Sequence, residues 1–224
     1  MEKGAEKATE ILSTRIFLIR HGETDWNRIH RFQGRIDIPL NEEGKKQAHT
    51  LALALKDEPL TAIYSSPLIR AMETARFIKV FHPSTPLFEE ESLVEMDLGE
   101  FDGMEAEVLA TKYQVFFKTW RSTPATLKMP GGESLQEVQI RAIDTVERIN
   151  KLYPSRSTLL LCSHNFVNRT ILCHALGISL DRFQEVQQDT ATLNILYMQG
   201  QRLWAEVVND LSHLKKYKVV SLQT

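Results

Sequence analysis

Cysteine is scarce in this sequence, which carries only Cys162 and Cys173 among its 224 residues. Two cysteines are too few for a disulfide framework. Each lies in an apolar run, so we interpret both as small buried hydrophobic residues and not as redox or nucleophilic groups. The cysteines and histidines also lack the spacing of a zinc site, and we therefore expect no bound metal.

Long hydrophobic runs and an excess of one charge are also missing. No apolar run approaches the length of a membrane span, and residues 1–13 lack the apolar centre of a signal peptide, so we expect a cytoplasmic protein with no membrane partner. Lys and Arg total 27 against 29 for Asp and Glu, which gives no reason to expect nucleic acid as a partner. The hydrophobic content of 42% predicts one large domain over residues 15–224 after an N-terminal tail, residues 1–14.

What the sequence does contain is a short apolar run, Ile16–Ile19, that changes in one step to Arg20, His21 and Gly22. The run predicts a strand buried on both faces, and ligands of open α/β sheets bind outside the carboxyl ends of the strands. A neutral imidazole can attack phosphorus, Arg20 offers planar donors that suit phosphate, and Gly22 lets the backbone approach closely. We favour His21 as a nucleophile over the alternative, an ordinary strand-end histidine.

The same layout occurs a second time in the chain. Thr158–Cys162 predicts another buried strand, Ser163 and His164 follow it, and a helical pattern then runs to Gly177. We expect His164 to lie beside His21 as a charged or donating partner for phosphoryl oxygens. The alternative is a structural histidine.

One arginine is predicted where a helix would disfavour a cation. Ala62–Tyr64 predicts a buried strand, and Ser66 and Pro67 predict the cap and the first residue of the next helix. Arg70 then falls in the first helical turn, near the positive end of the helix dipole. A bound anion would reverse that cost, since helix N-termini and arginine both suit phosphate. The alternative is a surface arginine tolerated near a helix start.

Glu95 is our candidate for a general acid. Apolar residues flank it, and both partial burial and a nearby phosphate dianion would raise its pKa. A carboxylic acid that stays protonated near neutral pH can donate to a leaving-group oxygen. Asp97 and Glu100 are competing candidates.

Two further segments flank this predicted site. Residues 26–39 predict a loop rich in hydrogen-bond donors, of which we assign Arg28 and Arg31 to the solvated surface. Residues 104–130 predict a helical, lid-like insertion whose aromatic residues belong either to the core or to the site mouth. Its lysines would suit an organic phosphate with a second charged group.

Several motifs together resemble one family, the histidine phosphatase superfamily in its phosphoglycerate-mutase-like branch (branch 1). The resemblance spans Arg15 to Asp210, and no single motif would be decisive. Its motifs are Arg20-His21-Gly22-Glu23-Thr24 with Asn27, Phe32-Gln33-Gly34-Arg35, Pro39–Gly44, Tyr64–Ala71, Glu95 ahead of Leu98–Gly103, and Ser163-His164.

The resemblance implies a three-layer α/β/α sandwich with a mainly parallel central sheet, and hydrolysis of a small phosphorylated metabolite through a phosphohistidine, without metal or cofactor. It makes Asn27, Gln33 and Gly34 pocket residues. Asn165 stands where the family usually has glycine. Asparagine tolerates left-handed backbone angles, so we expect the backbone to be kept and the side chain to reach the pocket or the substrate. The catalytic set it implies is His21, Glu95, Arg20, Arg70 and His164.

Three alternatives stay open at this point. The first is a cofactor-dependent phosphoglycerate mutase, although the region between Glu95 and His164 looks too short for the long insertion of such mutases. The second is a specific phosphoserine or α-ribazole phosphatase, and the third is an inactive phosphate-binding or interaction module. His213 is a minor candidate for substrate contact, and the sequence leaves open a homodimer and the identity of the substrate.

Overall fold

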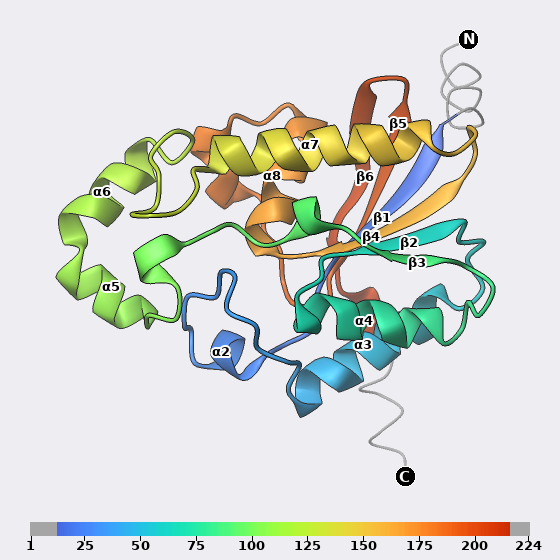
Figure 1. Ribbon diagram of the computed structural model, residues 1–224, viewed down its shortest axis with the longest axis horizontal. Coiled ribbons are helices and arrows are strands. Elements are labelled where there is room, and N and C mark those ends of the chain that lie inside the picture. The colour runs from blue at the N-terminus through green and yellow to red at the C-terminus, as the bar shows by residue number, and fades with distance from the viewer. Residues whose placement is uncertain (1–12, 216–224) are drawn as a thin grey trace.

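The computed structural model describes residues 13–215, so the predicted tail lies almost wholly outside the described residues. One sheet of six strands forms its centre, in the order β3-β2-β4-β1-β5-β6 (Figure 1). The pairings among β3, β2, β4 and β1 are parallel, and β5 runs antiparallel to both β1 and β6. The strands are β1 (Thr14–Arg20), β2 (Ala62–Ser65), β3 (Leu87–Glu89), β4 (Thr158–Ser163), β5 (Leu193–Gln199) and β6 (Arg202–Asp210).

Helices cover both faces of the sheet, as Figure 1 shows. Alternate residues of β1 explain why: Phe17 and Ile19 pack in one hydrophobic cluster with α3 (Glu42–Leu55) and α4 (Ile69–Lys79). Ile16 and Leu18 pack in a second cluster with α7 (Leu135–Lys151) and α8 (Asn165–Leu176). Side chains of a strand alternate between faces, so a continuous apolar run needs a helical layer on each side. The predicted three-layer sandwich with a mainly parallel sheet is therefore confirmed.

The register of the strands brings three chain segments to one edge of the sheet. Arg20 of β1 pairs with Ser163 of β4, and Ser65 of β2 pairs with Cys162. The next residue of each chain segment therefore emerges at the same edge. This is the carboxyl edge of the parallel strands, where ligands of such sheets bind.

The start of α4 differs from the prediction. The helix begins at Ile69, two residues after Pro67, and its N-cap Leu68 makes no side-chain capping hydrogen bond. Ser66 does not cap it because its hydroxyl contacts the ring of His164 and accepts from the backbone N–H of Leu68. Arg70 is still in the first turn, as expected.

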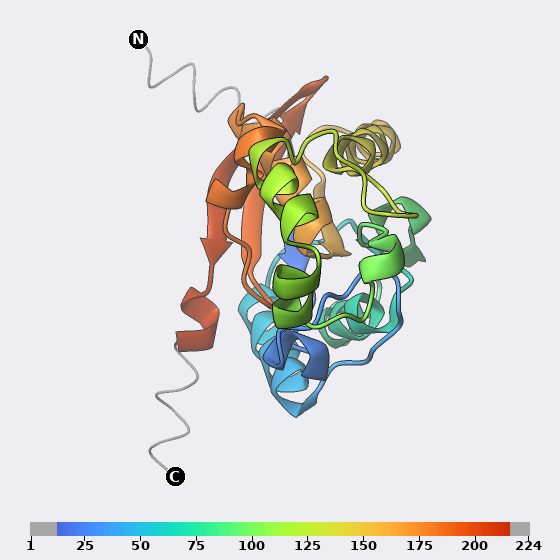
Figure 2. The ribbon, with the colours of Figure 1, turned by 90° about the vertical axis from the view of Figure 1, so that its left-hand side faces the viewer.

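Residues 104–130 form the predicted helical segment, as α5 (Ala106–Lys112) and α6 (Gln114–Ser122). The segment crosses the end of the molecule between α8 and the short helix α2 (Asp25–Arg28), which lies in the predicted loop (Figure 2). Phe117 and Trp120 are buried in the cluster on the α7 and α8 side, so these two aromatic residues belong to the core. Three 3₁₀ turns complete the described elements: η1 (Glu91–Leu93), η2 (Gly99–Phe101) and η3 (Leu180–Glu185).

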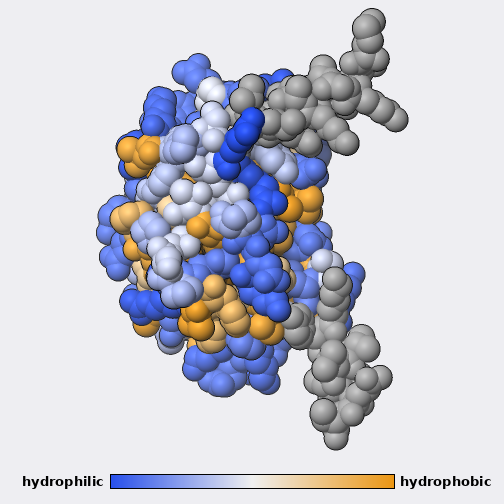
Figure 3. Space-filling view, turned by 90° about the vertical axis from the view of Figure 1, so that its right-hand side faces the viewer, coloured by the Kyte–Doolittle hydropathy of each residue, from blue (hydrophilic) through white to orange (hydrophobic). Residues whose placement is uncertain are grey.

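The structure bears on two further expectations, the end of the N-terminal tail and the lack of a membrane span. Thr14, which we assigned to the tail, is the first residue of β1. Within residues 13–215, no helix is long and apolar enough to cross a bilayer. On the face shown in Figure 3, apolar residues form separate clusters among polar and charged ones, and the homodimer stays a prediction.

Candidate active site

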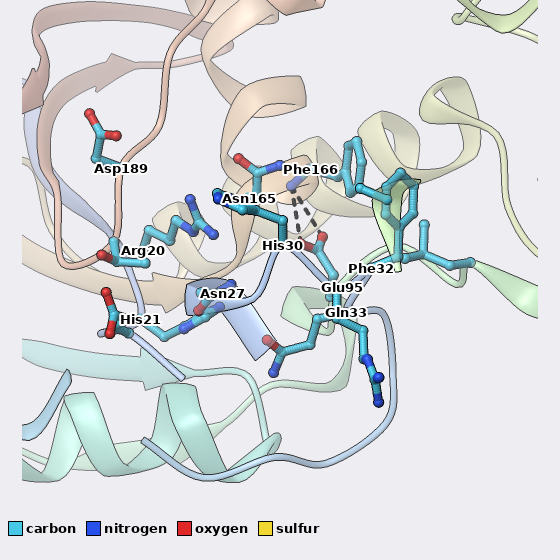
Figure 4. Close-up of a pocket in the computed structure, with 15 residues that line it drawn as sticks. Arg20, His21, Asn27, His30, Phe32, Gln33, Glu95, Asn165, Phe166 and Asp189 are labelled. Atoms are coloured by element: carbon cyan, nitrogen blue, oxygen red, sulfur yellow. Dashed lines mark hydrogen bonds between the residues drawn. The ribbon is translucent and has the colours of Figure 1, made fainter. Parts of the chain in front are cut away.

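A cavity of about 520 Å³ opens at the carboxyl edge of the sheet. Six of the nine predicted site residues line it, namely Arg20, His21, Asn27, Gln33, Glu95 and Asn165. In Figure 4, Arg20 and His21 lie on one side of the cavity and Phe32 and Phe166 on the other. Its other lining residues are Glu23, His30, Arg31, Leu98, Ala106, Asp189 and Thr190.

His21 follows β1 directly, and only 3% of its surface is exposed. Its Nδ1 lies 2.7 Å from the carbonyl oxygen of Gly22. A carbonyl only accepts, so Nδ1 carries the proton and Nε2 keeps its lone pair in the neutral ring. Burial, followed by the charges of Arg70 and Arg20, holds the pKa of His21 well below its usual value. The ring is therefore neutral at neutral pH, the form that a nucleophile needs.

The backbone beside His21 packs closely against the first turn of α3. A Cβ on Gly22 would lie 2.5 Å from the carbonyl oxygen of Gly44, and a Cβ on Gly44 would lie 2.0 Å from that of Glu23. The close approach that we expected at Gly22 is therefore to the backbone of α3. It fixes the loop that carries His21 and Glu23 against a helix.

His164 follows β4, and its ring centroid lies 5.1 Å from that of His21. Its Nδ1 accepts from Nε of Arg70 at 3.2 Å, and its Nε2 lies 2.7 Å from Oγ of Ser66. Burial, and next the charge of Arg70, hold the pKa of His164 well below its usual value. The ring is thus neutral, with Nε2 donating to Ser66. Sequence reasoning did not place Ser66 here, although its position directly after β2 could have indicated it.

Arg70 is fully buried in the first turn of α4. Besides His164, its guanidinium donates to the carbonyl oxygens of Gly34 at 2.7 Å and Ile36 at 3.0 Å. The amide of Gln33 satisfies its neighbours when its oxygen accepts from Arg70 and its nitrogen donates to Thr24. Burial lowers the pKa of Arg70 to about 10, so the group stays charged.

Asp102 holds the loop that supports Arg70. Its carboxylate accepts from three consecutive backbone N–H groups, those of Gly34 and Arg35 at 2.8 Å and of Ile36 at 3.0 Å. The carbonyl oxygens of Gly34 and Ile36 in the same loop accept the hydrogen bonds from Arg70. Gly34, which we expected in the pocket, does not line it: a Cβ there would lie 3.0 Å from the Asp102 carboxylate. Arg70 and His164 are likewise not part of the cavity lining.

Arg20 lines the cavity and is anchored at one end. Its Nη1 donates to the carbonyl oxygen of Gln188 at 2.6 Å, while its Nε is buried with no hydrogen-bond partner among the described residues. Burial lowers the pKa of Arg20 to about 10, so it keeps its charge. An unpartnered buried donor on a cation fits a site for an anion.

Glu95 is 2% exposed and lies over the N-terminus of α8. Its carboxylate accepts from the backbone N–H groups of Met96 at 2.8 Å, Phe166 at 3.2 Å and Val167 at 3.4 Å (Figure 4 draws the bonds to Phe166). Burial raises the pKa of Glu95, and the backbone bonds and the nearby arginines only partly oppose this rise.

Glu95 is the only one of the three candidate acids that lines the cavity. The carboxylate of Asp97 pairs with Arg35 at 3.4 Å, and Glu100 is exposed. Arg141 of α7, which sequence reasoning missed, donates to the carbonyl oxygens of Glu95 at 3.2 Å and of Ser92 at 2.7 Å. It fixes the backbone that carries Glu95.

The structure also decides the expectations for three further residues. Asn165 lines the cavity as expected, but as the first residue of α8 it takes helical angles and not left-handed ones. Arg31, which we assigned to the solvated surface, lines the cavity. His213 does not line it and instead bonds the carbonyl oxygen of Ala191 at 3.0 Å.

Both cysteines are buried free thiols, as expected. Burial raises the pKa of Cys162 to about 12 and that of Cys173 to about 11, so neither is a thiolate at neutral pH. Within residues 13–215, no three His, Cys, Asp or Glu side chains come together as a potential metal-binding group. The expectation of a metal-independent reaction stays a prediction.

Comparisons with known proteins show which proteins this chain is similar to. The family model of the histidine phosphatase superfamily (branch 1) matches residues 16–211. Phosphoserine phosphatase 1 of Hydrogenobacter thermophilus is 34% identical over 205 residues, which cover 92% of this chain and 96% of that protein. The metal-independent phosphoserine phosphatase of Arabidopsis thaliana is 32% identical over 203 residues, 90% of this chain and 83% of that protein. The solved structure of Bacillus stearothermophilus YhfR is 29% identical with a TM-score of 0.83, and the match covers 90% of this chain and 99% of that one.

Proposed function

We propose a reaction path for this chain, which belongs to the histidine phosphatase superfamily (branch 1) and is a phosphomonoester hydrolase. His21 is the nucleophile and Glu95 the general acid. The observation that carries the proposal is the neutral ring of His21, with its Nε2 lone pair unprotonated, in the same cavity as a buried carboxyl group of raised pKa.

The reaction has two steps. In the first, Nε2 of His21 forms a bond to phosphorus, the bond from phosphorus to the ester oxygen breaks, and protonated Glu95 gives its proton to that oxygen. In the second, water attacks the phosphohistidine, Glu95 takes a proton from it, and the phosphorus–nitrogen bond breaks to release inorganic phosphate. Each step is an easier displacement than direct attack of water on the ester.

Cations hold the phosphoryl oxygens. Arg20 has an unused donor in the cavity wall, and Arg70 and His164 lie immediately behind His21. Burial, and next the charge of Arg70, lower the pKa of His164, and a dianion beside the ring would raise it. To donate to a phosphoryl oxygen, as we expected from the sequence, the protonated ring gives up the bond that its Nδ1 accepts from Nε of Arg70.

The substrate is a small phosphorylated metabolite. Phosphoserine is the first one to test, because two of the relatives are named for its hydrolysis. A mutase would return the phosphoryl group to an organic acceptor instead of water, so a separate mutase assay distinguishes that alternative. The location of the protein and its independence of cofactors stay predictions.

The proposal is tested by trapping the intermediate. Labelled p-nitrophenyl phosphate, quenched in alkali where phosphohistidine survives, should transfer its label to the unsubstituted protein and not to His21→Ala. His49→Ala, on the exposed face of α3, is the matched control and should label and turn over normally. Undiminished turnover by a folded His21→Ala protein would refute the role of His21.

A further inference from the structure

The cavity wall contains a cation, Arg31, that the reaction path does not use. Arg31 lines the cavity beside Phe32, and the carbon at the centre of its guanidinium lies 5.4 Å from the ring of Trp26. Within the described residues, the one hydrogen bond of its side chain runs from Nη2 to Oε1 of Glu105 at 2.7 Å. Its Nε is buried without a partner.

We infer that Arg31 selects substrates with a carboxylate in the leaving group, and that Glu105 competes with this carboxylate for the guanidinium. The inference rests on the proposed function, because it takes this cavity as the place where the leaving group binds. Arginine presents a planar pair of donors that matches a carboxylate.

The acidic residues of the cavity wall are already engaged. Glu95 accepts from the N-terminus of α8, Glu23 accepts from Nδ2 of Asn41 at 2.8 Å, and Asp189 accepts from Nδ2 of Asn209 at 2.8 Å. None of them is placed to pair with Arg31. Within the described residues, Arg31 is therefore paired only with Glu105, and a second negative charge on the substrate can compete for it.

We expected the lysines of residues 104–130 to pair with this second charge of the substrate, but none of them lines the cavity. Lys128 instead pairs with Glu137 at 2.5 Å. The lid-like segment acts through Glu105, its residue just before α5. An isolated β-bridge joins Arg31 to Glu105, and the next N–H, that of Ala106, donates to the carbonyl oxygen of His30 at 3.1 Å.

The ion pair between Arg31 and Glu105 is exposed enough to solvent for Arg31 to exchange Glu105 for another carboxylate. The Arg31 side chain is 31% exposed and that of Glu105 is 52% exposed. An ion pair at this exposure contributes little to stability, because water solvates and screens both charges. A substrate carboxylate can therefore take the place of Glu105. Removing the charge of Glu105 should then favour such substrates, which is the opposite of what loss of a purely structural contact would do.

The test compares phosphoserine with phosphoethanolamine, which differ only in the carboxylate. The measured quantity is the ratio of their kcat/KM values. Arg31→Gln should lower the preference for phosphoserine by about ten- to a hundredfold, the range of a hydrogen bond to a charged group. Glu105→Gln should raise the preference severalfold. Arg28→Gln is the matched control, since Arg28 lies in the same loop, outside this cavity, and pairs with Asp25; its ratio should stay unchanged.

Three results would overturn the inference: no preference for phosphoserine in the unsubstituted protein, an unchanged ratio in Arg31→Gln, or a lowered ratio in Glu105→Gln. Where turnover of either substrate is too slow, competitive inhibition of p-nitrophenyl phosphate hydrolysis gives the ratio of their inhibition constants, which should shift in the same directions. Failure of the proposed function has a different signature, because it would abolish labelling of His21 by the aryl phosphate. Normal labelling with no effect at Arg31 refutes the carboxylate site alone.

Discussion

Substitution of Glu95 by glutamine tests its proposed role as general acid, because the structure shows which hydrogen bonds of the carboxyl group an amide can keep. The amide is nearly the same size, and its oxygen can still accept the short bond from the backbone N–H of Met96. Its nitrogen would face the N–H of Phe166, which costs one hydrogen bond. The fold should therefore survive Glu95→Gln, while the proton that the leaving oxygen needs is lost.

The magnitude should depend on the leaving group. General acid catalysis contributes about 10²- to 10⁴-fold, which corresponds to about 3 to 5 kcal/mol in the barrier. Alkyl phosphates such as phosphoserine release a poorly stabilised alkoxide and need the proton, so Glu95→Gln should lose that full factor on them. Aryl phosphates release a stabilised phenoxide, and on p-nitrophenyl phosphate the loss should be about tenfold or less.

The pH profile gives an independent check of the same role. Burial raises the pKa of Glu95 above its ordinary value. Only the protonated carboxyl group can donate, so kcat/KM for an alkyl phosphate should fall as pH rises through this raised pKa. The glutamine side chain does not ionise, and Glu95→Gln should lose this part of the profile.

The assay is phosphate release from both ester classes across pH, with circular dichroism to confirm folding. Glu100→Gln is the matched control, since this exposed carboxylate lies five residues away and outside the cavity. It should leave both activities unchanged. An equal loss on alkyl and aryl esters in Glu95→Gln would move the acid role to another group.

Two further changes test how the site is held. Asp102→Asn removes the charge that binds three consecutive N–H groups of the loop supporting Arg70, and kcat/KM should fall by about 10²-fold. If Asp102 acts through Arg70, the same change in an Arg70→Ala background should lower kcat/KM little further. Full additivity of the two losses in kcat/KM would contradict this. Gly44→Ala places a Cβ 2.0 Å from the carbonyl oxygen of Glu23 and should lower the free energy of unfolding by about 1–3 kcal/mol in a urea titration; an unchanged midpoint would show that the backbone can move apart.

Several features of the molecule follow from local sequence patterns alone. The apolar run Ile16–Ile19 predicts a strand buried on both faces, and the structure confirms it with one helical layer against each face. Arg20 and His21 after this strand, and His164 after β4, could be placed together because parallel strands end at one edge. Such inferences hold because strand and helix periods are set by neighbouring residues.

The surroundings of similar side chains were decided by the tertiary structure. The sequence favoured Glu95 as the acid and kept Asp97 and Glu100 as competitors, and the structure separates the three because only Glu95 lines the cavity, against the N-terminus of α8. Arg31 and Arg28 were likewise assigned together to the surface, and only Arg31 lines the cavity.

The tertiary structure also decided which hydrogen bonds hold Arg70, His164 and the loop beside them. Arg70 contacts His164, which is 94 residues away in the chain, and Asp102 binds the N–H of Gly34, 68 residues away. No local pattern encodes such partners, because they depend on which loops the sheet brings to the same edge. The sequence by itself determined the layers and the position of His21 at the carboxyl edge of the sheet, whereas burial and long-range hydrogen bonds determined the charge state and the support of the groups around it.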